Sequence, residues 1–279
     1  MNRVIRLVMA LLLASVMVAP TALGETVTLG DAVIRAIKSG DAIDLDQDGA
    51  TETIEFETAI NEDGDVGPYT LKVNGQQLSG EGYLTGQLYA MRLGAGGYPG
   101  EAFLLVPEVG PSDWNVSYIY RYADARLSYV GEVPTAPESI CIQGSQFTGL
   151  VRARALQTWF RPADFVIART YAWDDDGEPI QDVRVAEVPR AIYPMGTVVK
   201  AKLQLTLLTS PTNADAAHTV QSGETVILTG SDDREWLNVQ ASTPDGNISG
   251  WLKIEDWSVL VGDKALSSDE VFDGLLFAG

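Results

Sequence analysis

The chain alternates apolar and polar residues with a period of two, and this pattern constrains its fold more than any other feature. The alternation is clearest in the runs 53–56, 118–122 and 183–185. A period of two points successive side chains to opposite faces, as in a strand that buries one face. These runs therefore predict β-strands.

Turn-forming dipeptides between such runs predict β-hairpins. They are Asn74-Gly75, Asp176-Gly177 and Asp245-Gly246. Helical signals are confined to a turn or two at 31–38 and to the C-terminal tail. In the tail, Ser267 and Glu270 form a capping-box pattern ahead of several apolar residues. We expect a mainly β fold with a short helix near its end.

Residues 1–24 are organised like a secretory signal peptide. Arg3 and Arg6 precede an apolar run at 7–18, and Ala22-Leu23-Gly24 forms a small-x-small cleavage site. The run is shorter than the roughly 20 apolar residues of a membrane helix, although an uncleaved anchor is the alternative. We expect a secreted protein, extracellular or associated with the cell envelope, with no membrane span after cleavage.

The composition excludes several classes of function. The 279 residues include 19 Lys and Arg against 38 Asp and Glu, a formal net charge of -19, which repels nucleic acid and suits cations. Cys141 and His218 are the only cysteine and histidine, which excludes disulfides and most zinc, thiol and serine-histidine chemistry. Cys141 stands between two isoleucines and is expected to be buried and inert, whereas His218 is expected in a polar surface loop.

The length allows about two domains. Pro189, Pro194 and Gly196 interrupt the strand pattern and place a boundary near residue 190. We expect a signal peptide at 1–24, a β-domain at 25–190, a second module at 191–262 and a tail at 263–279. Within the β-domain, 43–56 aligns weakly with 91–105, which indicates two degenerate copies of one β-unit unless the likeness is coincidence.

An acidic loop, DLDQDGATETIE at 44–55, has the spacing of a calcium site. Asp44, Asp46 and Asp48 stand at positions 1, 3 and 5, and Gly49 permits the sharp turn at position 6. Hard oxygen ligands at alternate positions can wrap one Ca²⁺ ion.

The downstream half of this loop departs from an EF-hand. Ala50 can offer its carbonyl at position 7 and Glu52 its carboxylate at position 9. Thr51 replaces the aliphatic residue of position 8, and the strand-like alternation that follows turns Glu55 toward solvent. The ligand set that we expect is Asp44, Asp46, Asp48, the Ala50 carbonyl and Glu52. The alternative is a solvated acidic turn.

Residues 43–56 resemble the calcium loop of FG-GAP and VCBS-type repeats, which occur in integrin-like β-propellers and in many secreted bacterial proteins. A weaker likeness extends to about Val133. The resemblance implies a β-domain related to propeller-type repeats. In the second copy, Arg92, Gly94 and Gly96 replace the aspartates, so the resemblance implies one metal ion only.

The chain from Lys200 resembles a bacterial SH3-like domain. The matching segments are 207–211, Gly223-Glu224-Thr225-Val226, Trp236 and Gly250-Trp251-Leu252. This resemblance implies a small SH3-like β-barrel that binds cell-wall peptide, glycan or an extracellular protein, without catalysis. Trp236, Trp251 and Trp257 are candidates for a ligand groove, although the first two are also candidates for the barrel core.

Two other segments have structural interpretations. The acidic cluster 174–178 is expected at a hairpin tip, and the aromatic residues of 114–122 are expected to pack in the core on alternate positions.

The function that we expect is that of a secreted, monomeric, noncatalytic calcium-binding protein that docks at the cell envelope. The alternatives are a glycan hydrolase that uses paired carboxylates, with the SH3-like module for targeting, and a protein-binding adhesion or inhibitor module.

Overall fold

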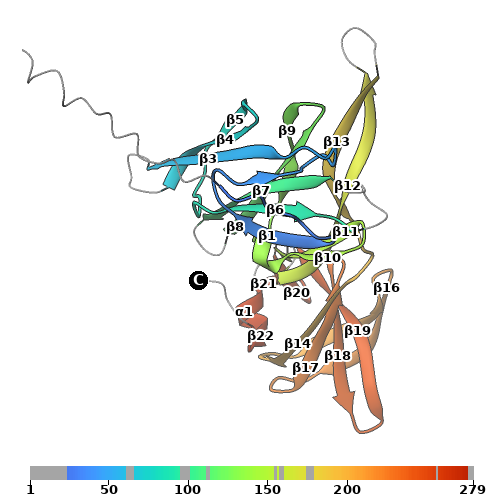
Figure 1. Cartoon of the computed structure of the whole chain (residues 1–279). Coiled ribbons are helices and arrows are strands. Elements are labelled where there is room, and N and C mark those ends of the chain that lie inside the picture. The colour runs from blue at the N-terminus through green and yellow to red at the C-terminus, as the bar shows by residue number, and fades with distance from the viewer. Residues whose placement is uncertain are drawn as a thin grey trace, which may run out of the picture.

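The computed structural model describes residues 24–60, 66–94, 101–110, 114–153, 156, 160–173, 179–255 and 257–275. The described chain is mainly β, as predicted (Figure 1). The expected signal peptide at 1–24 lies outside it, apart from its last residue. Within these ranges, no helix has both the length and the apolar character needed to cross a membrane.

Three antiparallel sheets come first, and each contains four strands that are consecutive in the chain. The first holds β2 (Ala42–Ile43), β3 (Glu52–Ile60), β4 (Val66–Val73) and β5 (Gln76–Gly80). The second holds β6 (Leu88–Arg92), β7 (Ala102–Gly110), β8 (Trp114–Ala123) and β9 (Arg126–Val133), with β1 (Val33–Ile37) added beside β6. The third holds β10 (Cys141–Gln143), β11 (Gln146–Arg152), β12 (Phe160–Trp173) and β13 (Pro179–Val188), after a 3-10 turn at Pro137–Ser139.

The second sheet is buried on both faces because the first and third sheets pack against it (Figure 1). Leu104 of β7 joins Ile54 of β3 in one core. The next residue, Leu105, points to the opposite face and joins Phe147 and Phe165 of the third sheet in another core. The rings of Phe147 and Phe165 stack with centroids 5.5 Å apart. Successive side chains of β7 therefore pack into two different cores, one on each face of the second sheet.

Two of the three predicted hairpin turns lie in the described part of the chain, and both join paired strands. Asn74 and Gly75 join β4 to β5 with positive φ values of 46° and 83°, the backbone that a tight hairpin turn requires. Pro244 and Asp245 link β18 (Trp236–Thr243) to β19 (Gly246–Glu255), so Gly246 is the first residue of the second strand and pairs with Thr243. Strands β12 and β13 pair as expected, whereas the acidic cluster 174–178 between them lies outside the described residues.

Two expectations for the N-terminal half are wrong. The segment 31–38 contains strand β1 at Val33–Ile37 and no helix, because pairing with β6 satisfies the backbone of 33–37 and buries Ile37 in the core of the first two sheets. Cys141 is exposed. Ile140 and Ile142, on either side of Cys141, pack against the core between the second and third sheets. Because side chains alternate along strand β10, the Cys141 thiol points to the other side.

The C-terminal strands form a nine-stranded sheet that surrounds a mainly aliphatic core. Besides β18 and β19, it contains β14 (Tyr193–Ala201), β15 (Leu205–Ser210), β16 (Asn213–Val220), β17 (Thr225–Ser231), β20 (Ser258–Val261), β21 (Lys264–Ser267) and β22 (Phe272–Asp273). The core also takes in Ala153 and Leu156, which precede β12. The division into two separate domains at residue 190 stays a prediction.

The core of this sheet is filled by residues other than the tryptophans. Leu237 and Leu252 are directly paired and buried, so Trp236 and Trp251 fall on the opposite face and are only half-buried. The interpretation of Trp236 and Trp251 as residues of the barrel core is therefore wrong. His218 lies in strand β16, opposite Leu207, instead of in a loop.

The tail contains the expected short helix, α1 (Ser268–Val271). Its capping box is present, with Glu270 accepting the backbone N–H of Ser267 at 2.9 Å. Glu270 also accepts the hydroxyl of Ser267 at 2.9 Å. The helix ends by burying Val271 and Phe272 in the C-terminal core. Strands β21 and β22 flank it, so the tail is part of the sheet structure.

Candidate functional site

The acidic loop joins β2 to β3 and brings three carboxylates together. One oxygen from each of Asp44, Asp46 and Asp48 lies within 4.8 Å of the other two. The backbone turns back through Gln47 and Gly49, whose φ values are 63° and 91°. Because the three aspartates are close in sequence, one tight turn is enough to bring their carboxylates together.

Hydrogen bonds inside the loop orient two of these side chains. Asp46 accepts the amide of Asp48 at 3.3 Å, and Asp48 accepts the amide of Ala50 at 2.7 Å. Each bond leaves the second carboxylate oxygen of the residue available to a cation. That the carbonyl of Ala50, at position 7 of the loop, is a ligand stays a prediction.

The loop is anchored to the second sheet. Leu45 is fully buried, and its carbonyl accepts the amide of Ala102 at 2.7 Å. Arg92, itself buried, donates through Nη2 to the carbonyl of Asp44 at 2.8 Å and through Nη1 to the carbonyl of Leu29 at 2.8 Å. Arg92 thus braces the acidic loop. The alignment of 43–56 with 91–105 places Arg92 opposite Asp44 but does not indicate this role.

Glu52 lies beneath the loop at the start of β3. It is only 3% exposed, and its Oε2 accepts the amide of Leu45 at 2.8 Å. Burial raises the pKa of Glu52; the Leu45 amide opposes this, and the charges of Asp46, Asp48 and Asp44 raise the pKa further. Among the described residues, the group within 4.8 Å contains the three aspartates and not Glu52. Glu52 therefore belongs to the same electrostatic cluster, and its place as a direct ligand stays a prediction.

The donor set fits a hard cation. Asp44 Oδ1 is buried and has no hydrogen-bond partner among the described residues. A buried, unpartnered carboxylate oxygen is costly unless a proton or a cation satisfies it. Carboxylate oxygens without nitrogen or sulfur donors are typical of Ca²⁺ and Mg²⁺ sites. The loop can thus hold a divalent cation.

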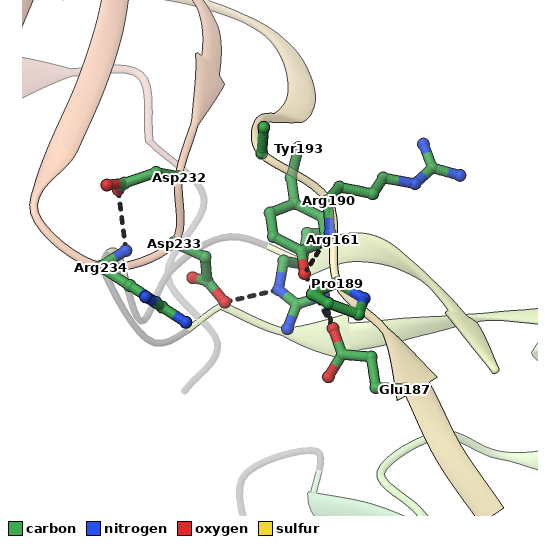
Figure 2. A pocket seen from close by; sticks show the side chains of 9 residues that line it. Arg161, Glu187, Pro189, Arg190, Tyr193, Asp232, Asp233 and Arg234 are labelled. Carbon is green, nitrogen blue, oxygen red and sulfur yellow. Dashed lines mark hydrogen bonds and ion pairs between the residues drawn. The ribbon is translucent and has the colours of Figure 1, made fainter.

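A second site, a polar pocket of about 420 Å³, lies where the third sheet meets the C-terminal sheet (Figure 2). Arg161 of β12 lies at its centre with its side chain almost fully buried. Its Nε lies 2.5 Å from Asp233, its Nη1 lies 2.8 Å from Glu187, and its guanidinium carbon lies 4.0 Å from the ring centroid of Tyr193. Burial lowers the pKa of Arg161, but the two carboxylates outweigh it and raise the pKa.

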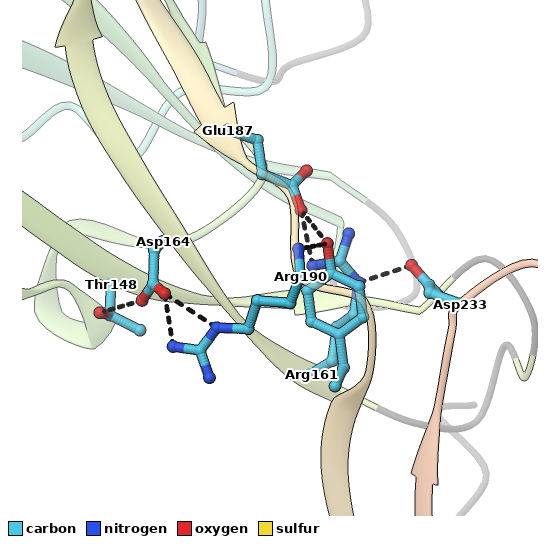
Figure 3. A network of polar contacts seen from close by, with 7 residues as sticks. Thr148, Arg161, Asp164, Glu187, Arg190 and Asp233 are labelled. Atoms are coloured by element: carbon cyan, nitrogen blue, oxygen red, sulfur yellow. Dashed lines mark hydrogen bonds and ion pairs between the residues drawn. The ribbon is translucent and has the colours of Figure 1, made fainter. Parts of the chain in front are cut away.

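Two of the arginines that line this pocket, Arg161 and Arg190, are paired with carboxylates (Figure 3). Arg190 points away from Arg161 and donates to Asp164, which also accepts the hydroxyl of Thr148 at 2.8 Å. Burial raises the pKa of Asp164, but Arg190 and Thr148 outweigh it and lower the pKa. Asp232 accepts three backbone amides, from Arg234 to Trp236, and so shapes the turn that carries Asp233. The formal charges that line the pocket therefore balance, with three arginines (Arg161, Arg190 and Arg234) against three carboxylates (Glu187, Asp232 and Asp233).

Sequence reasoning missed this network, although β12 contains a signal for it. Arg161 shares the buried face of the strand with Ala163, Phe165 and Ile167. A charged residue at an apolar position of an alternating strand needs a buried partner. Nothing in the sequence indicated that the partner is Asp233.

No family model, curated protein or solved structure matches this chain.

Proposed function

We propose that this is a secreted, noncatalytic protein whose first two sheets are stabilised by one Ca²⁺ ion in the acidic loop. The observation that carries the proposal is Asp44: its buried Oδ1 has no hydrogen-bond partner among the described residues, and it lies beside two further aspartates. A divalent cation would satisfy that oxygen and relieve the repulsion among the carboxylates.

The anchoring of the loop supports a structural role for the ion. Arg92 and Ala102 tie the loop to the second sheet, so a cation that orders the loop also strengthens the contact between two sheets. Because these contacts exist only in the folded chain, the cation binds the folded form preferentially and raises its stability. Extracellular calcium modules bind with dissociation constants of about 0.1 to 1 mM.

We propose further that the C-terminal sheet is the docking module, with cell-wall peptide or glycan, or an extracellular protein, as its partner. The resemblance to SH3-like domains supports this proposal, as does the exposure of aromatic surface. Trp257 is 58% exposed, and Trp236 and Trp251 are half-buried on the face opposite the core. Aromatic faces at a surface contribute much binding area at low entropic cost.

Calorimetry tests the calcium proposal. Ca²⁺ titrated into chelator-treated protein should give one saturable site, and Asp44→Asn should abolish it. Asp124→Asn is the matched control, because Asp124 is exposed in the turn between β8 and β9. An affinity that is equal in both variants, or the absence of binding at about 10 mM Ca²⁺, well above the expected range, would refute the proposal.

Sedimentation with purified cell walls tests the docking proposal. Protein that pellets with the walls supports it, and loss of pelleting in Trp257→Ala would place the contact on the C-terminal sheet. Protein that stays in the supernatant contradicts envelope docking. Release of soluble sugar or peptide from the walls would instead identify a hydrolase.

A further inference from the structure

A tyrosine-lined groove lies away from the acidic loop, beside β5 and β9, which are edge strands of the first and second sheets. It has a volume of about 280 Å³. Its walls include Leu78 and Glu81 and four tyrosines, Tyr69, Tyr118, Tyr120 and Tyr129. A second hollow of about 470 Å³ shares Tyr69 and Glu81 with it and reaches Glu57. The two hollows form one continuous surface across β4 and β5.

The tyrosines form a rigid aromatic base. Tyr69 and Tyr120 are 4% and 5% exposed, and their hydroxyls hydrogen-bond to each other. Tyr129 is 51% exposed, and its ring centroid lies 5.6 Å from that of Tyr120. Gly80 allows this arrangement, since a Cβ there would lie 2.5 Å from the hydroxyl of Tyr69. The groove therefore presents ring surface that is already ordered.

Three carboxylates surround these rings without a basic partner. Glu108 accepts the hydroxyl of Tyr118, Glu132 accepts that of Tyr129 at 3.2 Å, and Glu81 is exposed at the rim. Among the described residues, none of the three forms an ion pair with Lys or Arg, and no Lys or Arg lines the groove. In the polar pocket, by contrast, Glu187, Asp233 and Asp164 are each paired with an arginine. The groove is thus left with uncompensated negative charge.

The tyrosine phenol groups contribute to the electron-rich character of the groove. Burial and then the carboxylate of Glu132 raise the pKa of Tyr129 to about 12, and burial followed by Glu108 raises the pKa of Tyr118. Both phenols are therefore neutral near pH 7, and their hydroxyls are committed to the carboxylates. The surface that remains for a ligand consists of electron-rich ring faces and carboxylate oxygens.

We propose that this groove binds the guanidinium or ammonium group of an arginine or lysine side chain on a basic peptide. Cations are attracted to tyrosine ring faces, and carboxylates hydrogen-bond the same groups. A neutral sugar could stack on the rings, but it would leave the carboxylates uncompensated. The site shares no residue with the acidic loop.

A pair of synthetic peptides provides the test. Acetyl-Gly-Arg-Arg-Gly-amide should bind the purified protein in calorimetric or NMR titrations. The citrulline analogue, which has nearly the same shape without the charge, should bind at least about tenfold more weakly. Salt at about 0.5 M should weaken the binding of the arginine peptide, because salt screens exposed charges. Equal binding of the two peptides, or no binding of the arginine peptide, would overturn the proposal.

Variants locate the binding within the groove. We expect Glu81→Gln and Tyr129→Leu each to lower the affinity for the arginine peptide by about threefold to tenfold. Tyr129→Phe keeps the ring and should bind this peptide nearly as well as the wild type. Glu235→Gln is the control, since it removes the charge of an exposed carboxylate in the turn between β17 and β18. Circular dichroism confirms that each variant is folded. Unchanged affinity in both Glu81→Gln and Tyr129→Leu would contradict the assignment, as would tighter binding of a neutral oligosaccharide at the same tyrosines.

Discussion

The guanidinium of Arg161 lies 2.5 Å from the carboxylate of Asp233, and the two residues are 72 positions apart in the chain. Arg161 belongs to β12 of the third sheet, and Asp233 belongs to the turn between β17 and β18. Their side chains are only 5% and 4% exposed. This buried ion pair is therefore a direct connection between the third sheet and the C-terminal sheet.

Removal of one partner of this pair should be costly, because the other would remain as an uncompensated buried charge. We expect Asp233→Asn and Arg161→Met each to lower the free energy of unfolding by about 3 kcal/mol, measured by urea denaturation. The control is Asp182→Asn, whose partner Arg184 is 71% exposed and for which a loss below about 1 kcal/mol is expected. Equal losses at the two sites would show that the buried pair has no special role.

Glu52 should affect stability in opposite directions with and without calcium. The pKa of Glu52 is raised above the ordinary 4.5. Its favourable contribution to the free energy of unfolding is therefore fully present below pH 4.5 and is lost as the pH rises through the raised pKa. In chelator at pH 7, Glu52→Gln should therefore unfold at a higher temperature than the wild type. With millimolar Ca²⁺ the order should reverse, because the variant has less negative charge beside the ion.

The control for this experiment is Glu55→Gln, an exposed residue of β3 whose carboxylate lies 3.6 Å from Lys72. It should change the melting temperature little in either condition. A Glu52→Gln variant with the same order of stability in chelator and in calcium would contradict the electrostatic coupling of Glu52 to the aspartates.

Tyr129 should keep its proton to a higher pH than an ordinary tyrosine. Burial, followed by Glu132, raises its pKa from 10.0 to about 12. The stability that depends on the protonated phenol is present below pH 10.0 and is lost as the pH rises toward 12. We expect Glu132→Gln to lower this pKa, as measured by NMR of the ring carbon that bears the hydroxyl.

Tyr89 is the internal control for that titration. Burial and Glu138 raise its pKa to about 12 as well, but Glu138 is not a neighbour of Tyr129. Glu132→Gln should leave Tyr89 unchanged. If Tyr129 also titrated as in the wild type, Glu132 would have no influence on it.

The capping box of α1 should contribute to the stability of the C-terminal sheet. Glu270→Ala removes the acceptor for two donors of Ser267, and we expect a loss of about 1 kcal/mol in the free energy of unfolding. The helix places Val271 and Phe272 in the core, so fraying would weaken that packing. Glu255→Ala, at an exposed position of β19, should change the unfolding midpoint by much less.

Local patterns in the sequence determined the strands, the hairpins and the tail helix. Asn74-Gly75 suits one kind of turn, and Ser267 with Glu270 closes one capping box, whatever the rest of the chain does. The spacing of Asp44, Asp46 and Asp48 is equally local, because a single turn converges residues so close in the chain. These features could be predicted since their energetics involve only a few neighbouring residues.

Tertiary structure alone decided which strand faces are buried and which distant charges meet. Cys141 and the strand at 33–37 differ from expectation because neighbouring sheets determine which side is covered and which backbone is paired. The partner of Arg161 and the tyrosine groove depend on sheets brought together from separate parts of the chain. Such contacts are chosen by the packing of whole sheets, whose faces are buried or exposed according to register and stacking, and a local pattern contains no information about either.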